Sequence, residues 1–401
     1  MKKVMIVGTG MGRDTLTQEG LHAVEKADLL MGAEKILLPF REPGKKIRIG
    51  YTFGEVQSAL NENSIETIAV LVSGDTGFYS AARKLQENLA GCEIETLPGI
   101  SSLSYFFAKR QKPWQDVFLL SRHGREGNLV DTVRRNQDTF LLTDDSLADD
   151  MRLLIDAGYG DLKVSVGENL GTKEERILSG RVRDFENPGT GMSRVMEIEN
   201  PDADPRIRSG IPDEEFARGD VPMTKSEVRA VDLSLLHLNP GETACDIGAG
   251  TGSVTVEMAL AAYKGRVYAV ERLQEGADLI RKNAARFHLG NVAVFRGNAA
   301  EVLLKLPKMD AAFIGGSGGE LSIILKTLFQ NNPDIRIVIN AVTPETVAES
   351  VSALSGEGKK FTVTEIGSTR SRMAGTRHLM QANNPVFIIS AGGEKTCTEG
   401  S

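Results

Sequence analysis

The sequence predicts an α/β protein with two halves, each built on a sheet of largely parallel strands covered by helices. At 401 residues the chain is longer than a single core usually supports, which favours two domains. Residues 243–271 read as strand, glycine turn, amphipathic helix and second strand, the opening of a right-handed βαβ unit. The first half repeats the same order, with apolar runs at 2–7, 68–73 and 93–97 that each end in a glycine- or serine-rich loop.

Composition narrows the class of protein. Hydrophobic residues make up 41% and charged residues 25%, as in ordinary globular proteins. The net charge of -7 argues against nucleic acid as the main partner, because such partners usually require a basic surface. Cys92, Cys245 and Cys397 lie far apart, so we expect neither a metal site nor a disulfide framework. No apolar run is long enough to span a bilayer, and the chain begins directly with a strand; we expect a cytoplasmic protein without a membrane partner.

The glycine turn of the second half is the strongest candidate for a ligand site. The turn consists of Gly248, Ala249, Gly250, Thr251 and Gly252. Glu271 ends the next strand about twenty residues later, where a carboxylate can accept both ribose hydroxyls of a nucleoside. Ser253 stands where a dinucleotide-binding pattern places its third glycine, and Asp246 before the turn suits a cationic sulfonium better than a pyrophosphate. S-adenosylmethionine is therefore the expected cofactor, and a nicotinamide dinucleotide stays an alternative.

The remaining strands of the second half complete a seven-stranded sheet. Further runs are expected near 292–295, 310–314, 335–340, 360–366 and 385–389. The loop after the fourth strand, 315–320, is almost all glycine and leaves room for a bulky planar substrate. Gly315 and Gly316 are candidate substrate contacts there, and Ser317 is a candidate catalytic residue.

An arginine-rich segment lies between the last two strands. Residues 368–380 contain Arg370, Arg372, Arg377 and His378 in an otherwise acidic chain, and we expect them to form a loop. Such a loop is usually solvated surface. Arginine is also well suited to hold carboxylates of a substrate bidentately, so these three arginines are candidate substrate contacts.

The first half offers a weaker set of signals. Its first glycine turn, 8–12, resembles a nucleotide fingerprint, but the next strand ends in Gly32 and Ala33 instead of an acid. The loops 74–80 and 98–102 follow two other strands and would meet at the carboxyl edge of a parallel sheet. His123, between two arginines, is a candidate anion contact. The runs near 175–178 and 194–198 are expected to be antiparallel strands.

The two halves are joined by a polar, proline-dotted segment. We predict a first domain over residues 1–200, a linker over 201–222, a second domain over 223–392 and a disordered tail over 393–401. At the start of the second domain, Thr224 followed by Glu227 three residues later predicts a capping box that begins a helix.

Five motifs of the first half resemble the tetrapyrrole methylase superfamily, above all its branch that methylates precorrin at a ring-bridging carbon. The motifs are VGTGMGRDTLT, VSGDTGFYS, LPGISSLSYFFAKRQKPWQD, LSRHGRE and VGENLGTKEERI, and the resemblance covers about residues 1–200. It implies a two-lobed class III methyltransferase with S-adenosylmethionine between the lobes. By this resemblance the methyl-donor site would contain Gly74, Asp75, Phe78, Tyr79, Ser101 and Ser102, with Gly10 facing the tetrapyrrole. Thr76 stands where many members carry proline.

The second half, over about residues 212–390, resembles the class I methyltransferase that acts in the same biosynthetic step. DIGAGTGS, VERLQEGADLIRKNAARF and FIGGSGGEL carry this resemblance, which implies a Rossmann-like domain with a seven-stranded mixed sheet. Carried over, Thr224 would contact the donor, Lys225 would lie near the substrate as a candidate catalytic residue, and Asn298 and Ala299 would contact the adenine.

Together the two resemblances imply a corrin-ring C-methyltransferase. The first half would methylate C5 of a tetrapyrrole precursor; the second would methylate C15 and decarboxylate the C12 acetate, in a homo-oligomer. Three other classes remain open: an RNA methyltransferase, a nicotinamide oxidoreductase, and a metabolite sensor with one degenerate half. The low aromatic content, 5%, counts against stacking on RNA bases.

Overall fold

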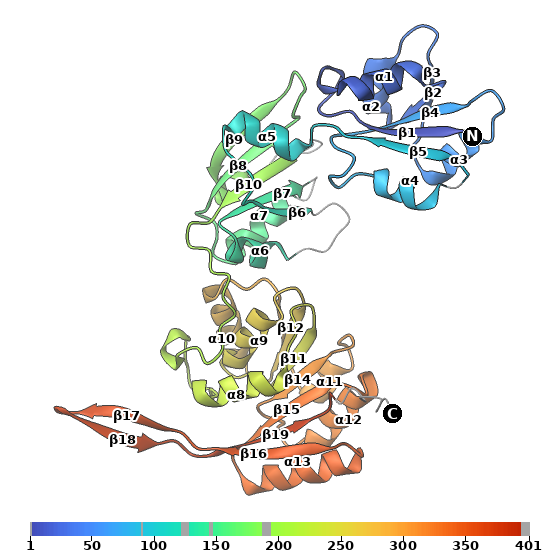
Figure 1. The fold of residues 1–401 in the computed structure, drawn as a ribbon. Helices are drawn as coiled ribbons and strands as arrows, with labels where there is room; N and C mark the ends of the chain where they lie inside the picture. Colours follow the sequence, from blue (N-terminus) through green and yellow to red (C-terminus); the bar gives the residue numbers. More distant parts are fainter. Residues whose placement is uncertain (1, 90, 122–127, 144–146, 187–193, 394–401) are drawn as a thin grey trace, which may run out of the picture. The chain divides into compact units, whose positions relative to one another are not determined.

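The structure, a computed structural model, describes residues 2–89, 91–121, 128–143, 147–186 and 194–393. The chain divides into two compact units (Figure 1). The first comprises Met1–Glu126, Asn136–Met151 and Leu162–Pro201, and the second comprises Gly127–Arg135, Arg152–Asp161 and Asp202–Ser401.

The first sheet of the first unit has five parallel strands in the order β3-β2-β4-β1-β5. Its strands are β1 (Lys3–Gly8), β2 (Leu29–Gly32), β3 (Lys46–Ile49), β4 (Thr67–Val72) and β5 (Glu93–Leu97). The helices are α1 (Gln18–Lys26), α2 (Glu34–Leu37), α3 (Phe53–Leu60) and α4 (Ala82–Asn88). Alternate β1 residues enter different cores: Val4 and Ile6 pack in the cluster that includes α3 and α4, and Met5 and Val7 pack in the cluster that includes α1 and α2. Both faces are thus covered, as a parallel sheet requires.

The second sheet of this unit is mixed, in the order β6-β7-β10-β8-β9. Its strands are β6 (Phe118–Ser121), β7 (Asp138–Thr143), β8 (Lys163–Glu168), β9 (Arg176–Arg181) and β10 (Arg194–Glu199), and helices α5 (Ser102–Arg110), α6 (Leu129–Arg135) and α7 (Leu147–Asp156) alternate with them along the chain. β10 is antiparallel to β7 and β8, and β9 is antiparallel to β8, so the late strands run as the sequence predicts.

The second unit contains the predicted seven-stranded mixed sheet, in the order β13-β12-β11-β14-β15-β19-β16. Its strands are β11 (Thr243–Ile247), β12 (Arg266–Glu271), β13 (Val292–Arg296), β14 (Ala311–Ile314), β15 (Arg336–Ala341), β16 (Phe361–Ile366) and β19 (Val386–Ala391). Only β19 opposes its neighbours; the five strands from β13 to β15 are parallel. Their carboxyl ends therefore lie at one edge of the sheet.

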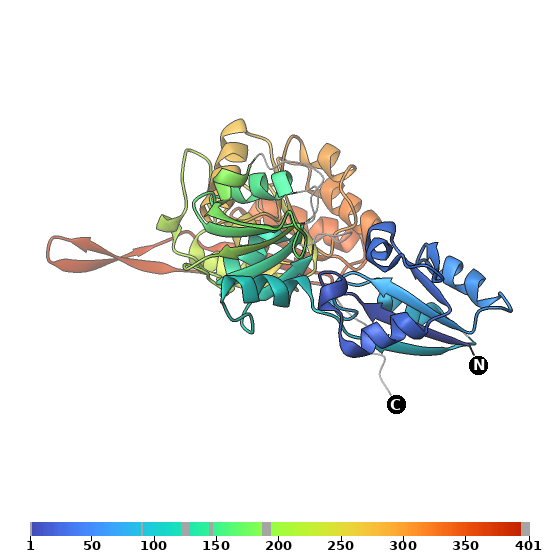
Figure 2. The same ribbon diagram turned by 90° about the horizontal axis from the view of Figure 1, so that it is seen from above.

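Helices cover both faces of this sheet (Figures 1 and 2). α8 (Ser226–Leu236), α9 (Ser253–Ala261) and α10 (Gln274–Arg286) contribute to one apolar cluster, and α11 (Ala299–Leu303), α12 (Leu321–Asn331) and α13 (Pro344–Gly356) contribute to the other. The segment predicted as a linker adds Ile211 and Phe216, both nearly fully buried, to the cluster of α8 and α9. Within the described ranges, no helix is long and apolar enough to cross a bilayer.

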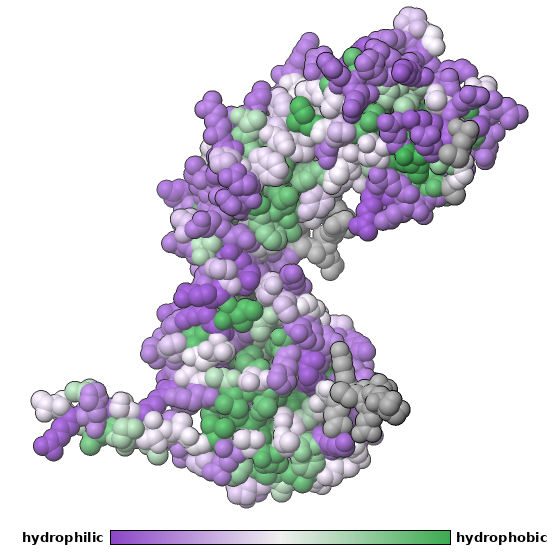
Figure 3. All heavy atoms as spheres, viewed as in Figure 1, coloured by the Kyte–Doolittle hydropathy of each residue, from purple (hydrophilic) through white to green (hydrophobic). Residues whose placement is uncertain are grey.

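Two local predictions differ from the structure. The arginine-rich segment is a two-stranded ribbon, β17 (Thr369–Ala374) and β18 (Arg377–Ala382), which extends away from the seven-stranded sheet (Figures 1 and 2). Its surface carries both hydrophilic and hydrophobic residues, and Met373 and Met380 are exposed there (Figure 3). The N-cap of α8 is Lys225, one residue after Thr224, and the predicted capping box does not form because the Glu227 carboxylate accepts hydrogen bonds from Arg370.

Candidate functional site

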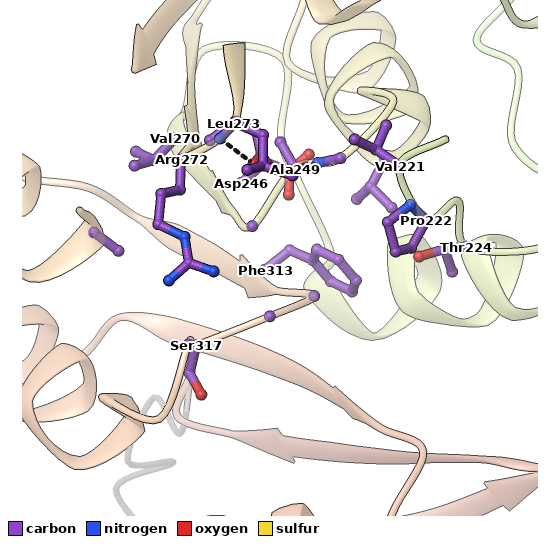
Figure 4. A pocket seen from close by; sticks show the side chains of 18 of the residues that line it. Val221, Pro222, Thr224, Asp246, Ala249, Val270, Arg272, Leu273, Phe313 and Ser317 are labelled. Atoms are coloured by element: carbon purple, nitrogen blue, oxygen red, sulfur yellow. Dashed lines mark hydrogen bonds between the residues drawn. The ribbon is translucent and has the colours of Figure 1, made fainter. Parts of the chain in front are cut away.

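A pocket opens at the carboxyl ends of β11 to β14 in the second unit (Figure 4). It has a volume of about 300 Å³. Four strand-end loops and the segment before α8 line it, with Val221, Pro222, Thr224, Asp246, Gly248, Ala249, Gly250, Ser253, Val254, Val270, Glu271, Arg272, Leu273, Gly297, Asn298, Ala299, Phe313, Gly315, Gly316, Ser317, Gly318 and Glu320. The pocket thus brings together most of the residues that the sequence singles out in this half.

The glycines of the turn after β11 allow three loops to meet. Gly248 and Gly250 adopt positive φ angles of 69° and 54°. A Cβ atom on Gly248 would lie 2.5 Å from the carbonyl oxygen of Gly316, and one on Gly250 would lie 2.5 Å from that of Pro222. A Cβ atom at either position would force two backbone segments apart, and both φ angles disfavour other residues, so glycine is required at both. Thr251 and Gly252 do not line the pocket; they lead the chain into α9, and the Thr251 hydroxyl is buried without a partner among the described residues.

Glu271 is held rigidly at the end of β12. Its side chain is nearly buried, and its two carboxylate oxygens accept hydrogen bonds from the backbone N–H groups of Gly250, at 2.9 Å, and Leu273, at 2.8 Å. Each carboxylate oxygen has further acceptor capacity, so the group can also accept hydroxyl donors from a ligand. The position is the one expected for a residue that binds a ribose.

The carboxyl group of Asp246, which lies just before the turn, has one oxygen without a hydrogen bond in the described part of the chain. It is fully buried, and the Thr255 hydroxyl donates a hydrogen bond to Oδ2, but Oδ1 has no partner among the described residues. Burial raises the pKa of Asp246 to about 7, because the charged form is poorly solvated there. A cation in the pocket would favour the ionised form, whereas a pyrophosphate would oppose it.

A buried guanidinium fixes the wall formed by residues 221–224. Arg229 on α8 is completely buried and pairs with Asp213, at 3.0 Å, and Glu257, at 2.9 Å. It also donates hydrogen bonds to the backbone carbonyls of Thr224 and Ile211. The pocket wall is therefore bonded to the interior of the unit and not left as a free loop.

The loops after β13 and β14 complete the pocket. Asn298 caps α11 by accepting a hydrogen bond from the N–H of Ala300, and its amide donates to Glu320 at 2.7 Å. Ala299 follows it in the lining, and Gly315, Gly316 and Ser317 form the opposite side. Lys225, the other candidate catalytic residue, caps α8 and is not among the lining residues.

The ribbon arginines do not reach this pocket. Arg370 pairs with Glu227 and, at 2.9 Å, with Asp213, and its guanidinium lowers the pKa of Glu227 to about 2. Arg370 therefore joins the ribbon to α8 and the turn at 213–215, and its donors are used within the protein. Arg372 and Arg377 lie exposed on the ribbon and are absent from the pocket lining. Their role as substrate contacts stays a prediction, and the geometry gives it no support at Arg370.

Several lining residues carry no signal in the sequence. Arg272 directly follows Glu271, and no pattern distinguishes it from other exposed arginines. Val221 and Pro222 belong to the predicted linker, and Phe313 belongs to a strand that reads as core. Only the fold brings these residues to the same edge.

In the first unit, three strand-end loops meet by backbone contact. A Cβ atom on Gly99 would lie 2.3 Å from the carbonyl oxygen of Gly74 and 2.7 Å from that of Gly8. Gly10 and Gly74 form a two-way backbone bridge, at 3.1 and 3.0 Å. The Asp75 carboxylate accepts hydrogen bonds from the N–H groups of Gly99, at 3.1 Å, and Gly77, at 2.8 Å. The structure thus brings Gly10, Gly74 and Asp75 to the carboxyl ends of adjacent strands β4, β1 and β5.

The other predicted donor-site residues of this unit divide into two groups. Ser101 caps α5, where its hydroxyl accepts a hydrogen bond from the N–H of Ser104, and Ser102 is the first residue of that helix. Phe78 and Tyr79 instead line a broad groove that includes residues of α4. The rings of Phe78 and Tyr79 pack edge to face, with their centroids 5.0 Å apart. The backbone of Tyr79 has a positive φ angle of 49°. His123 lies outside the described residues.

No cluster of potential metal ligands occurs in the part of the chain that the structure describes.

The second unit has the fold of a class I methyltransferase: a seven-stranded mixed sheet with a glycine turn after β11 and an acidic residue at the end of the neighbouring strand β12. Comparison with known proteins matches each half of the chain to a family model of its own. Residues 3–186 match the family model of tetrapyrrole (corrin/porphyrin) methylases, and residues 214–391 match that of the precorrin methyltransferase domain.

Named relatives agree with both family models. A probable cobalt-precorrin-6B C(15)-methyltransferase (decarboxylating) of Pyrobaculum calidifontis is 45% identical over 190 residues, 47% of this chain and 97% of the relative. A precorrin-6Y C(5,15)-methyltransferase [decarboxylating] of a Sinorhizobium species is 34% identical over 285 residues, 69% of each chain. A crystal structure of precorrin-6Y C5,15-methyltransferase from Geobacter metallireducens is 37% identical, with a TM-score of 0.44, over 46% of this chain and 97% of that chain. The chain belongs to the precorrin methyltransferase family.

Proposed function

We propose that this chain transfers methyl groups from S-adenosylmethionine to C5 and C15 of precorrin-6B or its cobalt form, and decarboxylates the C12 acetate side chain. Family membership makes the chain a methyltransferase of corrin biosynthesis. The positions that are methylated, the loss of the carboxyl group and the assignment of each reaction to one half are the proposal. A match over 285 residues to a C(5,15) enzyme supports it, because a match of that length must include residues of both family-model segments.

The chemistry of the second pocket fits the proposed donor. S-adenosylmethionine supplies an electrophilic methyl group on a sulfonium cation. Asp246 provides an unpaired buried carboxyl oxygen, which suits a cation, and Glu271 retains acceptor capacity for ribose hydroxyls. Among the lining residues, Arg272 is the only arginine or lysine, and it follows β12, so the glycine turn itself carries no cationic side chain. The unpaired oxygen of Asp246 is the observation that most favours a sulfonium donor over a dinucleotide.

The protein's part in methyl transfer is mainly positioning. An electron-rich ring carbon needs no strong base to accept a methyl group, so the pocket must hold that carbon in line with the leaving sulfur. The glycine-rich loop 315–319 gives a flat substrate access, because added Cβ atoms on Gly316 and Gly319 would meet nothing within 4 Å. When carbon dioxide leaves the acetate, the electron pair of the broken C–C bond passes into the conjugated ring, and a proton is added at the former methylene carbon.

In the first unit, the proposed donor site is the edge formed by Gly74, Asp75 and Ser101. The two carboxylate hydrogen bonds of Asp75 hold the loop after β4 against the loop after β5. We propose that this edge serves C5 methylation and that residues 1–200 and 223–392 act as separate catalytic domains.

The proposal is tested by incubating the full chain with methyl-labelled S-adenosylmethionine and a precorrin-6 pool. The expected product carries two additional methyl groups and has lost one carboxyl. Asp75→Asn should remove one methyl addition. Glu271→Gln should remove the other together with carbon dioxide release, because each variant damages a different donor site.

Glu345→Gln is the matched control, since Glu345 is exposed on α13 and is not among the lining residues. It should leave both reactions unchanged. If wild-type protein adds no methyl to the tetrapyrrole, or if both variants leave both methylations intact, the proposal fails.

A further inference from the structure

Arg272 is the only positively charged side chain among the residues that line the pocket of the second unit. The other charged lining residues are Asp246, Glu271 and Glu320, and each accepts a hydrogen bond from a neighbouring group. No ion pair or hydrogen bond of the Arg272 side chain occurs within the described residues, although acidic groups share the pocket with it. Its guanidinium therefore has five N–H donors available to a ligand.

The Arg272 side chain follows the pocket rim. It reaches from the end of β12 toward the loop after β14, on the side where Ser317 lies (Figure 4). One terminal nitrogen lies 3.7 Å from where a Cβ atom on Gly318 would stand, so the guanidinium rests beside this glycine-rich loop. The free donors thus border the open space through which a flat substrate would enter.

The contrast with Arg370 makes this position informative. The Arg370 guanidinium forms ion pairs with Glu227 and Asp213, and that of Arg134 forms one with Asp131. An arginine that stands in a pocket with no internal partner has no structural function that the contacts reveal, whereas a planar fork of donors is well suited to a carboxylate.

We propose that Arg272 is a substrate-anchoring residue that pairs with a peripheral carboxylate of the tetrapyrrole in the second site. This inference rests on the proposed function, because it takes the substrate to be a precorrin with acetate and propionate side chains. It assigns a substrate contact to the rim of the pocket itself instead of to the exposed ribbon.

The pairing also restricts which carboxylate Arg272 holds. A carboxylate that is to leave as carbon dioxide loses its negative charge in the transition state, so a strong ion pair to it would stabilise the ground state and slow the reaction. Arg272 should therefore hold a carboxylate that the product retains. Its loss should weaken substrate binding without changing the ratio of carbon dioxide released to methyl added at the second site.

The experiment uses the full chain with precorrin-6B and measures carbon dioxide release, which the proposed function assigns to the second unit alone. Arg272→Gln is expected to raise the KM for the tetrapyrrole about tenfold, since hydrogen bonds between charged groups are among the strongest in proteins. Arg272→Lys keeps the charge but loses the bidentate fork, and it should give an intermediate KM. The Kd for S-adenosylhomocysteine, measured by calorimetry, should stay within about twofold of wild type.

Arg281→Gln is the control for the loss of one positive charge, because Arg281 pairs with Asp278 on the exposed surface of α10. It should leave the KM unchanged. An unchanged KM in Arg272→Gln would overturn the inference. A change confined to the Kd for S-adenosylhomocysteine would also overturn it, because it would place the guanidinium against the adenine. A disproportionate change in carbon dioxide release would contradict the assignment to a retained carboxylate. Failure of the proposed function is recognised separately, by wild-type protein that neither methylates nor decarboxylates the tetrapyrrole.

Discussion

The two candidate edges of this protein are both made by glycine-rich loops after parallel strands, but they differ in what supports them besides close backbone contact. In the first unit, the loops after β1, β4 and β5 touch through their backbones, at Gly8, Gly74 and Gly99. In the second unit, the pocket wall at 221–224 is bonded through the buried Arg229 to Asp213 and Glu257. Close backbone contacts and carboxylate hydrogen bonds occur at both edges, and the second edge adds a buried arginine that is bonded to two acids.

This difference shows why a glycine turn alone is weak evidence for a cofactor. The glycines at the first edge are explained by backbone contact whether or not a ligand binds. The second edge adds a buried carboxyl oxygen of Asp246 without a partner among the described residues and an oriented carboxylate at Glu271, and these two groups favour a ligand that has a cation and hydroxyl donors.

The largest expected effect tests the buried charge of the second unit. Arg229→Met would leave Asp213 and Glu257 without their main cationic partner, which typically costs about 3–5 kcal/mol. We expect faster amide hydrogen exchange over residues 210–226 and a lower denaturation midpoint for this unit. The exposed-surface variant Arg281→Gln should change neither quantity appreciably. Equal exchange in the two variants would show that Arg229 does not hold the wall.

A smaller effect is expected from the close packing of the first unit. Gly99→Ala forces a Cβ atom to within 2.3 Å of the Gly74 carbonyl oxygen, and overpacking of this kind costs about 1–3 kcal/mol. Gly54→Ala is the matched control, because a Cβ atom there meets nothing within 4 Å and the residue lies in α3. Denaturant unfolding should show a loss of stability for Gly99→Ala alone. Unchanged stability would mean that the three loops are not locked together.

The sequence predicted the framework and the principal pocket residues because both depend on local patterns. Short, mostly apolar runs identified all seven strands of the second sheet, and the spacing from Gly248 to Glu271 identified the pocket. The short strand β3, with two charged residues in its four, was missed because it has no apolar run.

Long-range contacts explain the other failures. Glu227 looked like half of a capping box, but Arg370, 143 residues away, takes its carboxylate. Arg272 could not be distinguished from other arginines in the sequence, because it stands out only by lining the pocket without an ion pair or hydrogen bond among the described residues. Residues that act through tertiary contacts leave no periodic pattern in a single sequence.

The smallest expected effect is a pH dependence at Asp246. The pKa of this carboxyl is raised to about 7 by burial, so it is largely protonated at pH 6 and ionised at pH 8. Affinity for the cationic S-adenosylmethionine, relative to neutral S-adenosylhomocysteine, should rise up to about tenfold over this range as the attracting charge appears. Asp246→Asn should abolish the rise at the second site.

Ligand-free protein should show the opposite trend in stability. Because the folded-state pKa of Asp246 is above the unfolded value, its contribution is complete below about pH 4 and is lost as the pH rises through about 7. The denaturation midpoint of the second unit should fall over that range in wild type and less in Asp246→Asn. A wild-type affinity ratio that does not change with pH would contradict the assignment of Asp246 to a sulfonium site.

The central claim is that one chain carries two separate methyl-donor sites. Calorimetric titration of the full chain with S-adenosylmethionine tests it most directly, with Glu271→Gln titrated in parallel. We expect two equivalents bound per wild-type chain and one strongly bound equivalent in the variant. One equivalent or none in the wild type would contradict it.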